Sequence, residues 1–442
     1  GEQRDDALAA ARKILATNDP EAELQKLLSK GGAKGEIEPW LGEKVGAFAL
    51  SASASKRDGD GAIVAATSDP DAAGDWVADQ GTKTETYKDV TLHIDAKGQA
   101  YALVEDRVVA GKPAAVKATV DAAAGDALAD ADAFKDALDR VSGDEGVGRA
   151  YLAPRALAES NGTLPSTGGM FGSLAAGAAT GSLPTAVGAK FHADGTALKA
   201  DIATVGGAEG GNPADPDFVA ALTGKAWLAA GLGEIGPRLE KQLGASDAIL
   251  GLLGAQAGLD IKKDLLAWMG EGAVFVIGDS PATIGGALVV QSKDPAASKA
   301  AVAKLGTLIE RFATGSSVQP LRASGVDAGV RVTMQGVPAP VQIAAAGDRF
   351  VIAVGKDALD EAISPSSKLG DDADFTSAAA TLGDGLKPTT YVGLGKIGML
   401  AEVIGGSSGA DTSKVTDTLA RFTALVAADR GDGRYRASLG LR

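Results

Sequence analysis

The feature that most constrains this chain is a short motif that occurs twice. Trp40-Leu41-Gly42-Glu43 recurs as Trp268-Met269-Gly270-Glu271, 228 residues further along. Each copy leads directly into a run of apolar residues typical of a strand, at 45–50 and 273–277. A second strand pattern follows each run, opening with Gly-Ala and closing with Asp-Pro. The spacing therefore predicts that one structural unit is present in two copies.

The similarity between the two halves continues beyond this motif. Three further features recur in the same order: Asp106-Arg107 and Asp348-Arg349, Tyr151 and Tyr391, and the turns Asp194-Gly195 and Asp432-Gly433. Self-similarity at one spacing over nearly a whole unit is the signature of a duplication. We therefore predict two tandem homologous domains, residues 1–212 and 213–442.

The second copy begins with a strand pattern that the first copy lacks. Residues 226–230 read as a strand, and Trp227 lies 41 residues before Trp268. The matching position in the first copy would fall just upstream of Gly1. We expect the first domain to lack its opening strand, and a sheet that lacks a strand has an unpaired edge.

The periodicity of the segments between these motifs indicates the fold class. Asp69-Pro70 is typical of a helix start, and the helix is expected to run to about Gln80. Residues 87–95 alternate between apolar and polar side chains, as a strand with one wet face does. The predicted class is α+β, with each domain a mostly antiparallel β-sheet built of β-β-α units and helices packed on one face.

Composition excludes several classes of function. The net charge of −14 works against nucleic-acid binding, which depends on Lys and Arg neutralising phosphates. The chain contains no Cys, which excludes disulfides, thiolate metal sites and cysteine nucleophiles. The longest uncharged stretch, residues 160–189, is rich in Gly, Ala, Ser and Thr and too polar to span a membrane. We predict no transmembrane segment, and an apolar ligand, if one binds, beside this stretch or its counterpart at about 399–424.

Two glycine-rich patterns match the form of a dinucleotide-binding turn, at 231–236 and 393–398. Each follows a predicted strand, as the fingerprint requires. However, neither is followed by a parallel strand that carries an acid about 20 residues further on. We interpret both as strand-to-helix turns rather than as cofactor sites.

The remaining candidates for catalysis are weaker. Residues 405–409 match a nucleophile elbow around Ser407, but no histidine follows them to serve as the base. His93 and His192 lie on the polar sides of their predicted strands, where surface imidazoles are expected. Several acids cluster near helix starts without the spacing of a calcium loop. They are Asp126, Asp130, Asp132, Asp136, Asp139, Asp371, Asp372 and Asp374.

The duplicated motif supplies one pair of carboxylates, Glu43 and Glu271. If the two domains face each other, these groups could approach and act as an acid and a base. The structural alternative is favoured, because a polar residue before a strand needs no chemical role. The two Trp residues are interpreted as core anchors. The motif residues assigned a structural role are Trp40, Gly42, Glu43, Trp268, Gly270 and Glu271.

Several of these motifs together resemble a known family. They are the Trp40 strand entry, the Asp69-Pro70 helix start, the Asp106-Arg107 turn, and the helix start at 130–134 before Tyr151. The family is the uncharacterised, mainly actinobacterial domain-of-unknown-function 3352. The resemblance implies a protein of the cell envelope or extracellular space, because members usually carry an N-terminal signal or anchor. No such segment is recognised at 1–6. The family has no assigned activity and so transfers no functional residues.

These observations predict a non-enzymatic cell-envelope protein that acts as a structural or interaction module. The alternative is a carrier of an apolar ligand such as a lipid or acyl chain. No catalytic residue, cofactor or metal is predicted. The expected partner is an apolar small molecule or an envelope protein, and the oligomeric state is left open.

Overall fold

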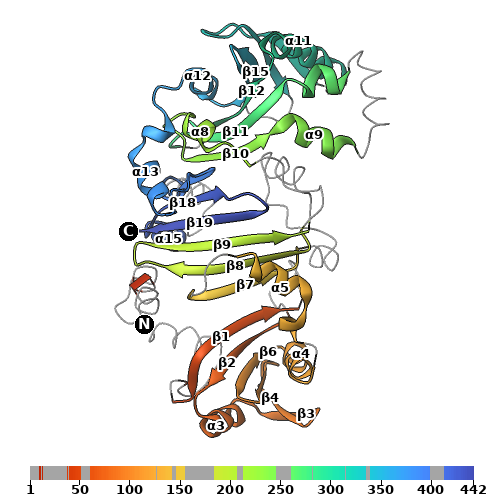
Figure 1. The fold of residues 1–442 in the computed structure, drawn as a ribbon, viewed down its shortest axis with the longest axis vertical. Helices are drawn as coiled ribbons and strands as arrows, with labels where there is room; N and C mark the ends of the chain where they lie inside the picture. The colour runs from red at the N-terminus through yellow and green to blue at the C-terminus, as the bar shows by residue number, and fades with distance from the viewer. Residues whose placement is uncertain are drawn as a thin grey trace.

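The chain folds into two antiparallel sheets with helices packed against them, in one elongated molecule (Figure 1). This is the predicted α+β class. The computed structural model describes residues 9, 10, 12, 37, 39–50, 60–125, 127–141, 146–154, 184–206, 213–244, 260–280, 282–313, 315–334, 339–398 and 413–442.

The smaller sheet contains six strands from the first half, in the order β1-β2-β6-β5-β4-β3. Its strands are β1 (Leu41–Ala49), β2 (Gly61–Thr67), β3 (Lys83–Tyr87), β4 (Val90–Ile94), β5 (Ala100–Val104) and β6 (Arg107–Gly111). Two helices pack on it, α3 (Pro70–Gln80) and α4 (Pro113–Ala123). The helix α3 follows β1 and β2, and α4 follows β5 and β6, so each is a β-β-α unit of the predicted kind.

The larger sheet contains thirteen strands in the order β13-β14-β15-β16-β12-β11-β10-β17-β18-β19-β9-β8-β7. In chain order the strands are β7 (Gly148–Leu152), β8 (Ala186–Ala193), β9 (Ala197–Val205), β10 (Leu228–Glu234), β11 (Met269–Ile277), β12 (Gly285–Ser292), β13 (Ser316–Pro320), β14 (Ala328–Met334), β15 (Val341–Ala346), β16 (Arg349–Val354), β17 (Thr390–Gly393), β18 (Phe422–Asp429) and β19 (Arg434–Leu441).

The remaining helices flank this larger sheet. The α-helices are α5 (Asp132–Asp139), α8 (Pro216–Ala220), α9 (Ile235–Gly244), α11 (Pro295–Phe312), α12 (Ala358–Ile363), α13 (Ala373–Ala380) and α15 (Ser413–Leu419). Two short 3-10 turns, η1 (Leu128–Asp130) and η3 (Leu369–Asp371), precede α5 and α13, and a π-helical turn, η2 (Ile261–Leu266), precedes β11.

Helices cover both faces of the sheets, which corrects the prediction of helices on one face. In β5, Tyr101 packs in the cluster that includes α3, whereas Ala100 and Ala102 pack in the cluster that includes α4. The second half repeats this arrangement, with α11 and α12 on opposite faces. The physical reason is that the central strands are apolar on both sides, so that each face needs cover.

The strand orders of the two halves correspond position by position. The first half reads β3-β4-β5-β6-β2-β1, then a break, then β7-β8-β9. The second half reads β13-β14-β15-β16-β12-β11, then β10, then β17-β18-β19. This order supports the proposed duplication. At the position that β10 fills in the second half, the described residues of the first half contain no strand.

Local details also recur in both halves. Asp69 caps α3 with φ −140° and ψ 94°, and Asp294 caps α11 with φ −141° and ψ 95°. The rings of Phe134 and Tyr151 lie 5.2 Å apart, and those of Phe375 and Tyr391 lie 5.4 Å apart. The same short motifs thus make the same local contacts in each half.

The two halves join through β9 and β19, which pair antiparallel from Ala197–Gly440 to Ala203–Arg434. The larger sheet therefore contains strands from both sides of residue 212, and the proposed repeat boundary does not separate the two sheets. In Figure 1, β7 forms the edge of this larger sheet that lies nearest to β1 of the smaller sheet.

Candidate functional site

The duplicated motif is part of the core in both halves. Trp40 is 4% exposed and Trp268 is 2% exposed. The Trp40 ring lies 5.0 Å from Trp76, and the Trp268 ring lies 5.0 Å from Phe350. Burial of such large side chains stabilises the packing of helix on sheet. These positions support the interpretation of the two Trp residues as core anchors.

The glycines of the motif are required by the close approach of a neighbouring strand. A Cβ atom on Gly42 would lie 2.8 Å from the carbonyl oxygen of Ala66, and one on Gly270 would lie 2.9 Å from that of Gln291. Both glycines lie at irregular positions in their strand pairing. The motif therefore preserves a bulge at which only a residue without a side chain fits.

The structure does not bring Glu43 and Glu271 together, so the acid–base hypothesis is wrong. Glu43 is exposed on β1 of the smaller sheet, whereas Glu271 lies on β11 of the larger sheet. From β11 to the edge of the larger sheet nearest β1, the strands are β10, β17, β18, β19, β9, β8 and β7. Burial raises the pKa of Glu271, and the amide of Asp215 donates a hydrogen bond of 2.8 Å to Oε1. Each carboxylate has a local structural environment.

The two glycine-rich patterns are strand-to-helix junctions in antiparallel structure. Residues 231–236 join β10 to α9, and β10 pairs antiparallel with both of its neighbours. A Cβ atom on Gly231 would lie 2.6 Å from the Cβ of Ala214, so this glycine serves close packing. Residues 393–398 follow β17, which is also paired antiparallel on both sides. A dinucleotide fingerprint needs a parallel βαβ unit, so the arrangement supports the structural interpretation.

The other sequence candidates are not assembled into a site. Residues 405–409, with the candidate elbow Ser407, and most of the uncharged stretch 160–189 lie outside the described residues. His93 and His192 lie on different sheets, in β4 and β8. Among the residues that the structure describes, no three His, Asp or Glu side chains are grouped to hold a metal ion.

One ionic cluster at the junction of the halves was missed by the sequence analysis. The buried carboxylate of Asp201 on β9 accepts hydrogen bonds from Arg436 on β19, from Nε at 2.7 Å and from Nη2 at 2.9 Å. Arg430 Nη1 also donates to Asp201 at 3.1 Å, and His192 Nε2 lies 3.4 Å away. Asp201 and Arg436 have opposite charges, but they are 235 residues apart in the sequence and no local pattern predicts that they meet.

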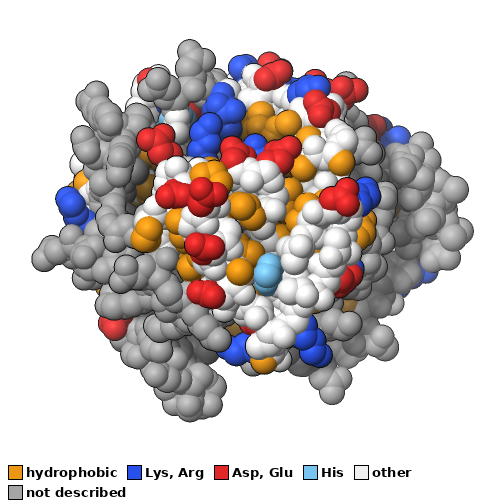
Figure 2. All heavy atoms as spheres, turned by 90° about the horizontal axis from the view of Figure 1, so that it is seen from below, with side chains coloured by type: hydrophobic (Ala, Val, Ile, Leu, Met, Phe, Trp, Pro, Cys, Tyr) orange, Lys and Arg blue, Asp and Glu red, His pale blue; other side chains and the backbone are white. Residues whose placement is uncertain are grey.

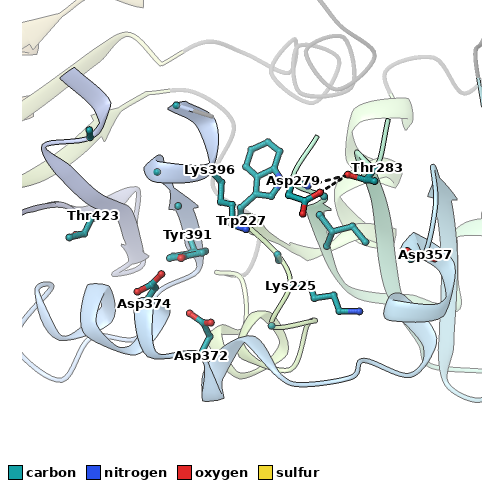
Figure 3. A pocket seen from close by; sticks show the side chains of 18 of the residues that line it. Lys225, Trp227, Asp279, Thr283, Asp357, Asp372, Asp374, Tyr391, Lys396 and Thr423 are labelled. Carbon is teal, nitrogen blue, oxygen red and sulfur yellow. Dashed lines mark hydrogen bonds between the residues drawn. The ribbon is translucent and has the colours of Figure 1, made fainter. Parts of the chain in front are cut away.

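A cavity of about 830 Å³ lies in the second half, at the ends of strands β10, β11 and β17 (Figure 3). Asp372 and Asp374 lie beside Tyr391 on one side, and Lys225 lies toward Asp357 on the other. Trp227 projects between these two sides of the cavity. The walls therefore carry charges of both signs among apolar groups.

The ionisable groups of this cavity are held by structural contacts. Lys225 Nζ donates to Oε1 of Glu361 at 2.7 Å, and Thr223 Oγ1 donates to Oε2 at 2.5 Å. Burial raises the pKa of Tyr391 to about 12, so that its phenol stays protonated at neutral pH. A phenol in this state cannot act as a base near pH 7. Among the described residues that line the cavity, the Thr283 hydroxyl donates to Asp279 Oδ1 at 2.9 Å, and Thr283 Oγ1 also accepts from the amides of Asp279 and Ser280, so that this contact belongs to the turn after β11.

The first half has a different feature, two strand edges with no partner strand among the described residues, on which exposed apolar side chains lie beside the exposed charges of Glu43, Lys44 and Arg149. Val45 on β1 is 60% exposed and Leu152 on β7 is 51% exposed. Among the described residues, β1 pairs only with β2 and β7 only with β8. Figure 2 shows the end of the molecule that carries the smaller sheet, where hydrophobic side chains lie among scattered acidic and basic ones. We take the two facing edges of β1 and β7 as the candidate functional site and call them the open position.

Fold and site define an α+β protein with mostly antiparallel sheets. Residues 26–179 match the model of a family described as "Protein of unknown function (DUF3352)". The match confirms the family resemblance over these residues. No curated protein and no solved structure matches the chain. Among the described residues, no helix is long and apolar enough to cross a membrane.

Proposed function

We propose that this protein is a non-enzymatic interaction module of the cell envelope. The observation that carries the proposal is the open position, where two strand edges with exposed apolar side chains face each other. Unpaired edges present backbone donors and acceptors to other chains, and proteins normally cover or charge them. Exposed apolar groups beside such edges are typical of a surface that is covered by a partner.

The core supports an interaction module over a carrier of an apolar ligand. Buried side chains from both faces of each sheet form continuous clusters, which leaves the sheet-helix layers filled. A carrier needs a continuous apolar cavity. The 830 Å³ cavity is lined by Lys225, Lys356, Asp357 and other charged residues, and an acyl chain there would desolvate charges without pairing them.

The non-enzymatic role is supported by the origin of the shifted pKa values. Structural ion pairs also shift pKa values, so a shift that such a pair explains is weaker evidence for a catalytic site. Here burial raises the pKa of Glu361, but hydrogen bonds from Lys225, Thr223 and Ser366 outweigh it and lower the pKa, and the same hydrogen bond to Glu361 raises the pKa of Lys225. The envelope or extracellular location rests on the family resemblance, whose members usually carry a signal or anchor.

A photo-crosslinking amino acid tests the proposed function. It would replace Leu152, which is 51% exposed at the open position, or Leu128, which is 52% exposed on η1. We expect one defined crosslinked product in envelope fractions from position 152 and none from position 128. Equal crosslinking from both positions, or none from either, would contradict the proposal.

A further inference from the structure

The cavity of about 830 Å³ in the second half has walls suited to a small polar molecule. We propose that it binds an uncharged saccharide, with the apolar face of one sugar ring against the indole of Trp227 and the sugar hydroxyls bonded to the polar groups of the walls. The inference goes beyond the proposed function, because this second site lies at the ends of β10, β11 and β17 rather than on β1 and β7.

Two hydrogen-bond donors of the cavity lack a protein acceptor. The Tyr391 side chain is only 5% exposed, and its hydroxyl has no hydrogen-bond partner among the described residues. Trp227 is partly exposed, but its Nε1 atom is buried and also has no partner. Buried donors are nearly always paired, and an unpaired one costs free energy. Both residues line the cavity, so a bound acceptor there would satisfy them (Figure 3).

Gly393 opens the cavity toward the Tyr391 hydroxyl. The Gly393 amide donates to the Trp227 carbonyl at 2.7 Å, which holds β17 beside the residue that carries the indole. A Cβ atom on Gly393 would lie 3.2 Å from Tyr391 Oη and 3.6 Å from the Trp227 carbonyl oxygen. Because glycine has no side chain, this space is left for an oxygen atom of a ligand.

The charges of the walls are mixed and not separated by sign. The described lining residues include the cations Lys225, Lys356, Lys396 and Arg442. They also include the carboxylates Asp279, Asp357, Asp372 and Asp374.

This mixture decides against a charged ligand. An anion would meet carboxylates and a cation would meet ammonium groups, and like charges placed together are unfavourable. A zwitterion would need the two signs on opposite walls, whereas Lys225 and Asp357 lie on the same side (Figure 3). An uncharged ligand that both donates and accepts hydrogen bonds avoids these costs.

A saccharide supplies both kinds of hydrogen bond and an apolar face. Its hydroxyls accept from indole, phenol and ammonium groups and donate to carboxylates, which only accept. Burial raises the pKa of Tyr391 to about 12, so its phenol remains a donor at neutral pH. The C–H face of a sugar ring is apolar, and Trp227 offers an aromatic surface between the two sides of the cavity (Figure 3). The volume is within the usual range of small-molecule sites, about 300 to 1,000 Å³.

Neutral trisaccharides of glucose, mannose, galactose and N-acetylglucosamine are the direct probes. Their binding to the full chain would be measured by calorimetry and by saturation-transfer NMR, with inorganic phosphate, spermidine and laurate as charged and apolar comparators. We expect at least one saccharide to bind saturably and to receive the strongest transfer at its C–H protons. If no saccharide binds at millimolar concentration, or if a comparator competes for the cavity with higher affinity, the proposal is wrong.

Tyr391→Phe separates a binding role from a structural one. The variant removes only a hydroxyl without a protein partner, so its melting temperature should be unchanged or higher, while saccharide binding should weaken about tenfold. Tyr101→Phe is the matched control, because Tyr101 is also 5% exposed but lies in the smaller sheet. Lower stability of Tyr391→Phe with unchanged saccharide affinity would overturn the proposal.

Replacement of Trp227 tests the aromatic surface. Trp227→Phe keeps an aromatic face and loses the Nε1 donor, whereas Trp227→Leu loses both. We expect saccharide affinity to fall in the order parent, Trp227→Phe, Trp227→Leu, with thermal unfolding to verify that each variant is folded. Equal affinities in the parent and Trp227→Phe, which is the milder change, together with unchanged binding by Tyr391→Phe would contradict the proposed site.

The outcomes separate this inference from the proposed function. Saccharide binding without a crosslinked product from position 152 would support the cavity site and count against the interaction module. Crosslinking from position 152 without saccharide binding would leave the interaction module standing and remove the cavity site.

Discussion

At the residue scale, the most consequential contact is the one between Asp201 and Arg436. It is a two-point pair between a planar guanidinium and a buried carboxylate, a geometry that Lys could not reproduce. Because Asp201 is only 4% exposed, it depends on its partners to offset the loss of water. The pair therefore ties β9 to β19 at the junction of the two halves.

Replacement of Arg436 by Gln should destabilise the protein by about 3 kcal/mol, because it leaves a buried charge with fewer partners. Arg434→Gln is the matched control, since Arg434 and Asp432 are exposed and lie 3.6 Å apart. Such surface pairs contribute at most about 1 kcal/mol. Urea unfolding of both variants measures the difference, and equal losses would mean that Asp201 does not depend on Arg436.

The pH dependence of stability should reflect Glu361. Burial raises its pKa, but hydrogen bonds from Lys225, Thr223 and Ser366 outweigh burial and lower it to about 2. A carboxyl with a lowered folded-state pKa stabilises the fold above its unfolded pKa and loses this as the pH falls through the folded value. The contribution, at most roughly 3 kcal/mol, should thus disappear between about pH 5 and pH 2.

Glu361→Gln tests this dependence. The variant should be less stable at pH 7 and should show a flatter decline in the free energy of unfolding between pH 5 and pH 2. Glu310→Gln, on the exposed side of α11, is the control for a carboxylate without such partners. A decline in Glu361→Gln as steep as in the parent protein would show that other carboxylates dominate.

At the element scale, the repeated Asp-Pro pair explains why α3 and α11 begin where they do. Asp69 Oδ1 accepts from the amides of Asp71 and Ala72, and Asp294 Oδ1 accepts from those of Ala296 and Ala297. The following proline has no amide to satisfy and its φ suits the first helical turn. Each cap also fixes the chain's exit from the preceding strand.

Asp69→Ala and Asp294→Ala should each cost about 1 kcal/mol, because each leaves two helix amides without an acceptor. Asp79→Ala, near the C-terminal end of α3, is the control and should have little effect, since an acid there opposes the helix dipole. Chemical denaturation of the three variants tests the prediction. A large difference between the losses in free energy of unfolding of Asp69→Ala and Asp294→Ala would argue against equivalent roles of the two caps.

At the scale of the whole molecule, the halves pair through equivalent strands, with unlike residues at matching positions. Leu198 pairs with Leu439, while Asp201 pairs with Arg436. Two copies of β19 paired in the same way would place Arg436 opposite Leu439, so that Arg436 would lose Asp201 and keep only Asp384 and the Leu382 carbonyl as partners. The ion pair between Asp201 and Arg436 therefore favours pairing of β19 with β9 over pairing with a second copy of β19.

Residues 213–442 produced alone should remain mainly monomeric, despite the exposed edge of β19, because Arg436 opposes self-pairing. The Arg436→Leu variant of this fragment should dimerise by joining the two β19 strands. Light scattering after size-exclusion chromatography measures both masses. A dimeric parent fragment, or a variant that stays monomeric, would contradict this account of pairing specificity.

Much of the element order could be predicted from the sequence. The Trp40 and Trp268 motifs and the Asp-Pro helix starts are local patterns, and the order of strands agrees with them. The helices on both faces were not predicted, because apolar runs of Ala and Val do not show which of two faces is covered. Glu43 and Glu271 were predicted to meet only if the domains faced each other, and they lie on separate sheets.

The sequence by itself determined what each segment forms, because turn chemistry, capping and periodicity act between residues that are close along the chain. Only the tertiary structure decided that β9 joins β19, that Asp201 meets Arg436, and that the edges of β1 and β7 are left facing each other. Those contacts depend on the packing of whole sheets, which brings together residues more than 100 positions apart.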